Sequence, residues 1–423
     1  MLDDLTTLLP GPDPAELLRL VRAEAGTMTA IRRDLHAHPE TGLDNPRTQS
    51  AVLAALEGLG LDIETGVGAS SIIATLYGRR PGRTVLLRAD TDALPLTEET
   101  GLPFASRTPG IAHACGHDAH TAMLLGAARV LAGPLRNRLT GTVRFVFQPG
   151  EEGCGGAEHM IKDGLLAEPT DAAFAVHVNP NLPTGMVATR PGAFFASCDE
   201  FEILLVGQGG HASMPHACVD PIQGALALGT ALLATVQRAF PPHTPVVVSL
   251  GAVNSGTTSN VIPETAVLKG TLRTFDPGVR AEAWKRIASL VDNIARAHRL
   301  DGRLSLRYGC PPTVNEPGHA RDALDLAEQL LGPGQALELT TPVMAAEDFG
   351  LILERVPGAL VLVGACPPDT TDPATAAPCH SGRLLLDEEC LVTGAALHIA
   401  AALAWTRGPV RTGASTTTGE SGT

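Results

Sequence analysis

The stretch Thr142-Val-Arg-Phe-Val-Phe-Gln-Pro-Gly-Glu-Glu-Gly153 contains the element that best indicates the fold and two residues that indicate the chemistry. Its first half, Thr142–Phe147, is an alternating apolar run of the kind that forms a buried strand. The turn residues Pro149-Gly150 follow, and then the adjacent carboxylates Glu151 and Glu152. A strand that delivers two acids to its carboxyl end is typical of a ligand site in an α/β protein.

Other predicted strands also lead into acids or histidine. Asp90 and Asp92 follow the strand Thr84–Arg88, and His177 lies in the strand Ala172–Val178. Further strands are predicted over Ser71–Tyr77 and Ala359–Val363, and helices over Ala15–Asp34, Thr48–Leu59, Ala119–Leu131, Glu347–Arg355 and Val392–Trp405. This alternation predicts an α/β fold, a mostly parallel sheet with helices on both faces. Because ligand sites gather at the carboxyl ends of such strands, we expect these polar side chains to lie together.

The middle of the chain has a different order of elements. Strands are predicted over Glu200–Val206, Pro245–Val253, Thr265–Thr274 and Arg303–Tyr308, and helices over Asp220–Arg238 and Val279–His298. Their order, β-α-β-β-α-β, is that of the ferredoxin-like split motif. A chain of 423 residues also exceeds one compact core. We therefore expect a catalytic domain in two parts, 1–198 and 310–407, an inserted α+β lid domain at 199–309, and a disordered tail at 408–423.

Composition narrows the class of partner. The chain has 45 acidic and 31 basic side chains and a net charge of −14, opposite to the basic face that nucleic acid or an anionic membrane requires. Its apolar stretches are too short or too interrupted to span a bilayer, and its acidic start lacks the features of a signal peptide. The eight cysteines show no disulfide spacing. These features predict a cytoplasmic protein with reduced thiols and without nucleic-acid or membrane partners.

The segment Ala112–Thr121, A-H-A-C-G-H-D-A-H-T, supplies further metal-binding side chains. Gly116 would let the backbone bend so that Cys115 and His117 meet one centre. A thiolate, imidazoles and carboxylates are together the donors of a transition-metal hydrolase. Two ligands do not complete a site, and the candidates for the remainder are Glu152, His177 and His380. Each of these candidate ligands, taken alone, is better explained as an ordinary buried or solvated residue. Their joint position at strand ends is what favours a metal.

The pair Glu151-Glu152 suggests two roles. Neighbouring carboxylates repel, and burial would raise the pKa of one unless a cation neutralised them. Because adjacent side chains on extended backbone point apart, Glu152 can bind metal while Glu151 accepts a proton from water as general base. The alternative is a solvated pair of loop acids, with which the flanking turn residues are equally compatible. A cysteine hydrolase, with Cys115 as nucleophile and His117 or His120 as base, is a second alternative.

Beyond these features, the chain resembles the di-metal amidohydrolases related to aminoacylase and carboxypeptidase, and more narrowly the branch of hippurate hydrolases and auxin-conjugate amidohydrolases. The resemblance runs from about residue 15 to 405 and rests on Arg32-Arg-Asp-Leu-His-Ala-His-Pro-Glu40, Arg88-Ala-Asp-Thr-Asp-Ala-Leu-Pro95, His113-Ala-Cys-Gly-His-Asp-Ala-His120, Phe147-Gln-Pro-Gly-Glu-Glu-Gly153, Gly209-Gly-His-Ala-Ser213, Asn260-Val-Ile-Pro263 and Ala346-Glu-Asp-Phe349. Thr91 stands where that family pattern has methionine, and the segment after His380 lacks an aromatic residue. Both departures bear on the shape of the pocket and remove no ligand.

The resemblance implies a zinc-exopeptidase-like catalytic domain with two divalent metal ions, Mn²⁺ or Zn²⁺. The implied ligands are Cys115, His117, Glu152, His177 and His380, with Glu151 as general base. Asp92 and Asp118 would fix the orientation of imidazoles, although capping of a turn or helix is the alternative. In the inserted domain, His211 would polarise the scissile carbonyl, and Asn260 and Arg273 would bind the carboxylate of the substrate. A homodimer formed through the lid domain is also expected.

The function expected is hydrolysis of the amide bond of an N-acyl amino acid, such as a hippurate-, N-acetyl- or indolylacetyl-amino-acid-like substrate. Aromatic residues make up only 3% of the chain, which leaves no obvious stacking platform and favours small or aliphatic acyl groups. A metallo-dipeptidase or carboxypeptidase acting on small peptides is the main alternative. A non-catalytic metal-binding relative is a remote one, because a binding protein has no use for a base beside the metal.

Overall fold

The computed structural model describes residues 12–407, which divide into two compact units. Unit 1 consists of the chain up to Gly192, Asn315–Thr340 and the chain from Leu351, and unit 2 consists of Ala193–Val314 and Thr341–Gly350. The predicted lid, 199–309, lies inside unit 2, which is wider and includes a second segment. The predicted tail, 408–423, lies outside the described residues.

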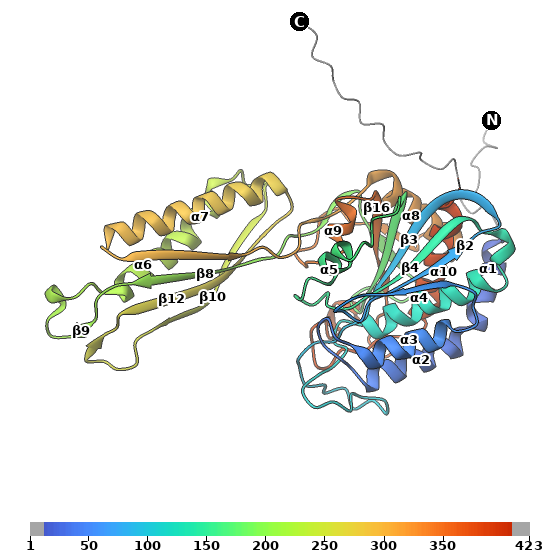
Figure 1. The fold of residues 1–423 in the computed structure, drawn as a ribbon, viewed down its shortest axis with the longest axis horizontal. Helices are drawn as coiled ribbons and strands as arrows, with labels where there is room; N and C mark the ends of the chain where they lie inside the picture. The colour runs from blue at the N-terminus through green and yellow to red at the C-terminus, as the bar shows by residue number, and fades with distance from the viewer. Residues whose placement is uncertain (1–11, 408–423) are drawn as a thin grey trace, which may run out of the picture. The chain divides into compact units, whose positions relative to one another are not determined.

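Unit 1 is built on an eight-stranded sheet in the order β1-β2-β4-β3-β5-β16-β6-β15 (Figure 1). The bounds in that order are Asp62–Thr65, Ile72–Tyr77, Thr140–Gln148, Arg80–Asp90, Ala172–Asn179, Gly358–Gly364, Val187–Thr189 and Ala336–Glu338. The central strands β4, β3, β5 and β16 are mutually parallel, whereas β2 and β1 continue the sheet antiparallel at one edge. The parallel centre brings the carboxyl ends of the predicted strands to one edge.

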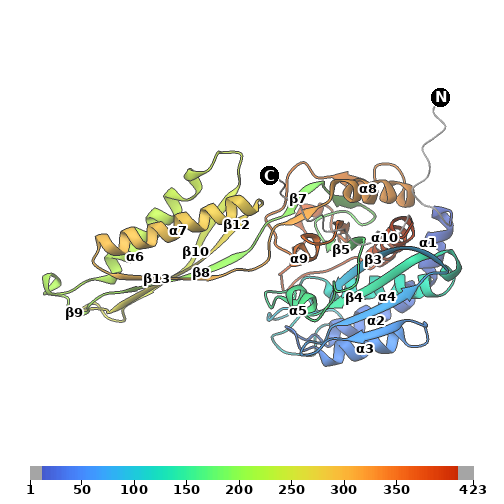
Figure 2. The ribbon, with the colours of Figure 1, turned by 45° about the horizontal axis from the view of Figure 1, so that its top comes forward.

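The two faces of this sheet are covered unequally. Six helices share one apolar core with alternate residues of the strands, namely α1 (Pro14–Ala23), α2 (Ala25–Ala37), α3 (Pro46–Leu56), α4 (His117–Ala132), α8 (Pro317–Leu331) and α10 (Cys390–Trp405). The short helix α5 (Gly156–Lys162) contacts β4 on the opposite face, where Arg144 donates to the Leu165 carbonyl at 2.6 Å. Figure 2 shows the layer of long helices against the strands. The predicted fold class is therefore confirmed.

Two predicted helices differ from the structure, and a third helix was not predicted. The single helix expected over Ala15–Asp34 is two helices, interrupted at Glu24. The helix expected over Glu347–Arg355 is reduced to α9 (Gly350–Leu353), because the Glu347 side chain accepts the Phe349 N–H at 3.0 Å and starts the helix late. Helix α8 was not predicted, although its side chains recur apolar at helical spacing and the Glu316 carboxylate caps it by accepting the His319 N–H at 2.8 Å.

Unit 2 has a four-stranded antiparallel sheet in the order β10-β12-β8-β13. Its strands are β8 (Asp199–Val206), β10 (Val246–Ser255), β12 (Thr265–Thr274) and β13 (Asp301–Arg307), and the helices α6 (Pro221–Thr235) and α7 (Pro277–Ala297) share one core with one face of it. The order along the chain is the β-α-β-β-α-β order that was predicted. Smaller elements are the paired strands β9 (Gly210–His211) and β11 (Val261–Ile262), the paired strands β7 (Gly192–Phe195) and β14 (Thr313–Asn315), and single 3₁₀ turns at Arg136–Arg138, Pro215–Ala217, Gln237–Ala239 and Pro373–Thr375. Among the described residues, no helix is both long and apolar enough to cross a membrane.

Candidate metal centre

The predicted ligands all lie in unit 1, at the carboxyl edge of its sheet. Cys115 and His117 flank the start of α4, Glu152 follows β4, His177 lies near the end of β5, and His380 lies in the loop before α10. Residues separated by up to 265 positions along the chain are thus brought to one place, which the parallel order of β4, β3 and β5 explains.

These donors form two overlapping sets. In one, donor atoms of Cys115, His117 and His177 lie within 4.8 Å of one another, and in the other, those of Cys115, Glu152 and His380 do. Cys115 Sγ is 3.5 Å from His177 Nε2, and His380 Nε2 is 3.2 Å from Glu152 Oε1. Because the thiol of Cys115 belongs to both sets, the arrangement has the form of two adjacent sites with one shared donor.

Gly116 is the residue that turns Cys115 and His117 toward this centre. Its φ is +83°, in the left-handed region, and a Cβ at this position would lie 2.4 Å from Val178 Cγ2. From the other side, the His380 N–H donates to the Ala114 carbonyl at 2.6 Å, which holds the loop that carries His380 against the Cys115 segment.

The chemistry of the site fits a cation. His117 is 1% exposed, and within residues 12–407 neither of its ring nitrogens has a hydrogen-bond partner. Although burial opposes protonation, the carboxylates of Asp90 and Asp92 raise the pKa of His117 to about 10. Buried donors without partners, in a pocket that favours positive charge, are what a metal ion would satisfy.

Asp92 holds both the glutamate pair and a ligand ring. Its two oxygens accept the N–H groups of Glu151 and Glu152 at 3.0 and 3.1 Å. Its Oδ1 also lies 3.6 Å from His117 Nδ1. One buried carboxylate therefore fixes the backbone that carries Glu151 and Glu152 and faces the ring of a predicted ligand.

Asp118 has a different role from the one expected. Its Oδ2 accepts hydrogen bonds from Arg32 Nε at 3.1 Å and from His36 Nδ1 at 2.9 Å. The imidazole that it contacts is that of His36, which is not a predicted ligand. Successive residues of a helix point about 100° apart, so Asp118 faces α2 while His117 faces the metal centre.

Asp90 and His120 are a buried pair that was not predicted to bind metal, although His120 was a candidate base in the cysteine-hydrolase alternative. His120 Nδ1 lies 2.5 Å from Asp90 Oδ1, and His120 Nε2 accepts the Val178 N–H at 2.8 Å. Burial lowers the pKa of His120 to about 4. Both ring nitrogens are occupied, so His120 acts as a neutral bridge between β3 and β5 and offers nothing to a metal. The group that occupies Nε2 is the backbone N–H of Val178, 58 residues further along the chain.

Cys379 is a second thiol at the centre. A hydrogen bond from Cys115 lowers its pKa to about 6, against the effect of burial, and the neighbouring rings of His177 and His380 act in the same direction. The signal in the sequence was a cysteine directly before the predicted ligand His380.

Glu151, the predicted base, lies at the edge of the donor cluster. An oxygen of its carboxylate lies within 4.8 Å of donor atoms of His117 and Glu152. Its backbone is fixed by Asp92, and its side chain is only partly buried. A group in this position can reach both a predicted metal ligand and solvent.

The substrate-binding residues predicted in unit 2 form two separate groups. His211 in β9 and Asn260 beside β11 are neighbours, because the Ala212 N–H donates to the Asn260 carbonyl at 3.1 Å, and both side chains are exposed. Arg273 lies near the other end of β12, where its Nη1 donates to the Met344 carbonyl at 2.9 Å. At ~3.4 Å per residue, β12 separates Arg273 from the end of the sheet that carries His211 by about 27 Å.

Comparison with known proteins agrees with these features. Residues 86–404 match Peptidase family M20/M25/M40. The chain is 36% identical over 372 residues to thermostable carboxypeptidase 1 of Saccharolobus solfataricus, covering 87% of this chain and 92% of that protein. It is 37% identical over 366 residues to N-acetyl-L-cysteine deacetylase of Bacillus subtilis, covering 86% and 85%.

Among solved structures, a dinuclear metal-binding peptidase of the M20 family from Bacillus subtilis superposes with a TM-score of 0.77 at 32% identity, covering 90% of this chain and 98% of that one. The resemblance stated from the motifs is thereby confirmed. The two overlapping donor sets and the glutamate pair are the parts of a metal site that such an enzyme requires. The chain belongs to Peptidase family M20/M25/M40 and is a metal-dependent hydrolase of amide or peptide bonds.

Proposed function

We propose that this protein hydrolyses the amide bond of N-acyl amino acids, with two divalent metal ions in unit 1 and Glu151 as general base. The observation that carries the proposal is the pair of donor sets that share Cys115, with the carboxylate of Glu151 beside them. The named relatives support the substrate class, since one is a deacetylase of an N-acetyl amino acid.

The metals would be held by Cys115, His117 and His177 on one side and by Cys115, Glu152 and His380 on the other. When bound, they would supply Lewis acidity that polarises the scissile carbonyl and makes water more acidic. We propose Zn²⁺ or Mn²⁺. The thiol donor favours zinc because of its softness, whereas the carboxylate also suits manganese.

Glu151 would move the proton. Its carboxylate accepts a proton from the attacking water and returns that proton to the nitrogen of the leaving amine, so that the acid and the free amino acid are released. Asp92 holds the backbone N–H of Glu151 at 3.0 Å and so limits the positions that the carboxylate can reach.

Recognition of the substrate would depend on unit 2. Arg273 presents a forked guanidinium suited to a carboxylate, and His211 and Asn260 offer a ring and an amide to the carbonyl or the same carboxylate. Within one copy of unit 2, these groups are about 27 Å apart, at ~3.4 Å per residue of β12. A small N-acyl amino acid cannot span that distance. We propose that two copies of the chain cooperate, one supplying Arg273 and the other His211 with Asn260.

We propose that the dimer forms through an exposed apolar surface of unit 2. Leu226 and Leu233, two turns apart on α6, are 60% and 47% exposed, and β10 is an edge strand of the sheet. The double variant Leu226→Glu, Leu233→Glu should sediment as a monomer and lose turnover while it keeps its metals. A variant that remains dimeric, or a fully active monomer, would contradict this part of the proposal.

The two alternative functions are supported unequally. A carboxypeptidase or dipeptidase is favoured by the thermostable carboxypeptidase among the relatives. A cysteine hydrolase is less favoured, because one of its two candidate bases, His120, has both ring nitrogens engaged and cannot serve Cys115, which leaves only His117 for that role. The eight cysteines are all free, which supports a reducing, cytoplasmic location.

A substrate screen tests the proposal. The purified protein, supplied with Zn²⁺ or Mn²⁺, is assayed on acetyl, benzoyl and indolylacetyl amino acids and on dipeptides, with and without a chelator. The proposal expects chelator-sensitive release of free amino acid from N-acyl substrates at a higher kcat/KM than from dipeptides. Faster cleavage of dipeptides would favour the peptidase, and activity that survives the chelator but not thiol alkylation would favour the cysteine hydrolase.

A further inference from the structure

The paired strands β9 and β11 carry two of the predicted substrate-binding residues, His211 and Asn260, on a small ribbon of unit 2. The turn after β9 is closed by the Met214 N–H, which donates to the His211 carbonyl at 2.8 Å. We call residues 210–214 and 258–262 the tip of unit 2. Because these backbone bonds fix the tip, what its side chains can bind depends on how each side chain is oriented.

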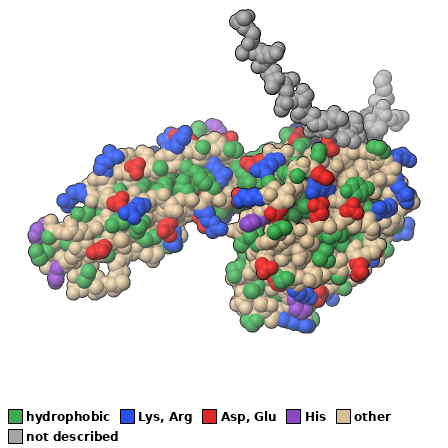
Figure 3. Space-filling model, viewed as in Figure 1, with side chains coloured by type: hydrophobic (Ala, Val, Ile, Leu, Met, Phe, Trp, Pro, Cys, Tyr) green, Lys and Arg blue, Asp and Glu red, His purple; other side chains and the backbone are tan. Residues whose placement is uncertain are grey.

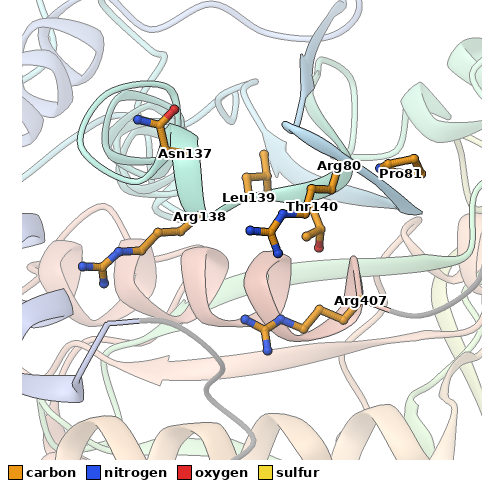
Figure 4. A pocket seen from close by; sticks show the side chains of 7 residues that line it. All are labelled: Arg80, Pro81, Asn137, Arg138, Leu139, Thr140 and Arg407. Atoms are coloured by element: carbon orange, nitrogen blue, oxygen red, sulfur yellow. The ribbon is translucent and has the colours of Figure 1, made fainter.

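The side chains of the tip are exposed. Figure 3 shows histidine side chains at the surface of unit 2, at the end that carries β9 in Figure 1. By contrast, a pocket of about 470 Å³ is lined by residues that include Arg80, Asn137 and Thr140, and its described lining residues all belong to unit 1 (Figure 4). On an open surface, a side chain is ordered by the hydrogen bonds that it makes and not by the walls of a pocket.

Ser213 makes two hydrogen bonds with one nitrogen of the His211 ring. Its backbone N–H donates to His211 Nδ1 at 3.1 Å, and its Oγ lies 2.8 Å from the same atom. A backbone N–H can only donate, so Nδ1 must present a lone pair and carry no proton. Since Nδ1 is then an acceptor, the hydroxyl also donates to it. The neutral ring therefore carries its proton on Nε2.

The same contacts disfavour a charged ring. An imidazolium carries a proton on both nitrogens, so it would set the Nδ1 proton against the Ser213 N–H and would lose both bonds. Within residues 12–407, no hydrogen bond uses His211 Nε2. The ring is thus held as a neutral group whose one donor, Nε2–H, remains available.

Thr258 acts on Asn260 in the same sense. Its Oγ1 donates to Asn260 Oδ1 at 3.0 Å, which occupies the oxygen of the amide. Among the described residues, the Nδ2 group of Asn260 has no hydrogen-bond partner. The tip therefore presents two neutral donors side by side, which suit the oxygen of a carbonyl or a carboxylate.

We propose that Ser213 is a positioning residue that holds His211 as the neutral Nε2–H tautomer, so that His211 acts on the substrate as a donor to oxygen and not as a base. This inference rests on the proposed function, in which His211 polarises the scissile carbonyl. Donors that are oriented before the reaction stabilise the negative charge that develops on that oxygen. Ser213 should therefore affect kcat more than KM.

Nitrogen NMR of the full-length protein loaded with Zn²⁺ tests the tautomer directly. The histidines are labelled with ¹⁵N, and the signals of His211 are assigned by their loss in His211→Gln. At about pH 8.5, where an ordinary imidazole is neutral, we expect a protonated Nε2 and an unprotonated Nδ1. In Ser213→Ala, the Nδ1 resonance should move downfield, because hydrogen bonding shields an unprotonated ring nitrogen and one of its two donors is lost. Ser213→Thr keeps the hydroxyl and should restore the resonance.

The kinetic test uses the same variants. We expect kcat for N-acyl amino acids to fall about fivefold in Ser213→Ala with KM little changed, which is the effect of one neutral hydrogen bond, and to recover in Ser213→Thr. The matched control is Ser255→Ala. Ser255 Oγ donates to the Thr265 carbonyl at 2.7 Å and not to a side chain of the tip, so kcat and KM should stay at the wild-type values.

Two results would overturn the inference. One is a proton on His211 Nδ1 in the wild-type protein at about pH 8.5, whether in the other tautomer or in a charged ring. The other is an unchanged kcat of Ser213→Ala in a protein that does hydrolyse N-acyl amino acids. The spectra do not depend on turnover, so a protein without amidohydrolase activity would refute the proposed function, while the spectra would still decide the tautomer of His211.

Discussion

The candidate metal centre of unit 1 and the predicted substrate-binding residues of unit 2 are built in opposite ways. In unit 1, the donor atoms of the predicted ligands are gathered around Cys115, and Asp92 alone fixes two backbone N–H groups and faces a ligand ring. In unit 2, His211 and Asn260 are exposed at the paired strands β9 and β11, and Arg273 lies near the far end of β12. The difference suggests that bond cleavage depends on a preorganised cluster within one unit, whereas binding of the substrate depends on groups that must be brought together.

The largest effect should follow from removing the base. Glu151→Gln keeps the size of the side chain and the backbone contact with Asp92 but cannot accept a proton. We expect kcat to fall about 10³-fold with KM little changed, within the range for a lost general base. Metal content should stay at the wild-type value, as measured by plasma mass spectrometry. If the variant keeps more than a tenth of wild-type kcat, Glu151 is not the base.

The next-largest effect should follow from changing Asp92, which holds the backbone of Glu151 and Glu152. Asp92→Asn keeps the shape but weakens the acceptor for Glu151 and Glu152, so metal affinity should fall about 10- to 100-fold. Competition with a chromophoric chelator measures this. The comparison variant is Asp90→Asn, whose partner His120 is not a predicted metal ligand, and it should lower stability more than metal affinity. The reverse pattern would show that Asp90, not Asp92, supports the metals.

A smaller effect is expected in unit 2. Arg273→Lys keeps the charge but loses the forked contact, so KM for N-acyl amino acids should rise about tenfold while kcat changes little. The matched variant is Arg303→Lys, on strand β13 of the same sheet, which should leave both constants unchanged. A lower kcat of Arg273→Lys at constant KM would show that Arg273 takes part in bond cleavage. The proposed division, with cleavage in unit 1 and substrate binding in unit 2, would then be wrong.

The smallest effect on turnover should come from the network under α4. Asp118 and Glu98 raise the pKa of His36 to about 9 against the effect of burial, and that of Glu98 is lowered to about 2. The stabilisation from His36 is therefore complete below pH 6.5 and is lost as the pH rises through 9. That from Glu98 is complete above pH 4.5 and is lost as the pH falls through 2. Both contribute fully between pH 4.5 and 6.5.

Urea unfolding measures this contribution. We expect wild type to lose up to about 3 kcal/mol more than His36→Gln between pH 6 and pH 9.5. Equal pH dependence of the two proteins would show that His36 is not held protonated. The comparison uses the difference between the proteins, so that titration of groups common to both cancels.

Much of the metal centre could be predicted because its residues follow strands. The runs before Glu152 and around His177 predict parallel strands, and parallel strands end at one edge. The contacts that could not be predicted are those between residues far apart along the chain. Nothing local shows that His120 meets the Val178 N–H, that Asp118 turns toward His36, or that Cys379 lies beside Cys115.

The fold outside the site shows the same limit. The strands of unit 2 alternate cleanly because one face is buried, so their bounds agree with the prediction within a few residues. Helix α9 is short because a side chain of Glu347 competes for the backbone, and a helical pattern does not reveal such a contact. The separation of Arg273 from His211 follows from the register of β12 and was invisible in the motifs alone.

The most direct test of the central claim is anomalous X-ray diffraction from crystals of the protein grown with Zn²⁺ or Mn²⁺. We predict two anomalous peaks per chain, about 3.5 Å apart, as in two-metal hydrolases. One should contact Cys115, His117 and His177, and the other Cys115, Glu152 and His380. A single peak, or two peaks that do not share Cys115, would contradict the account.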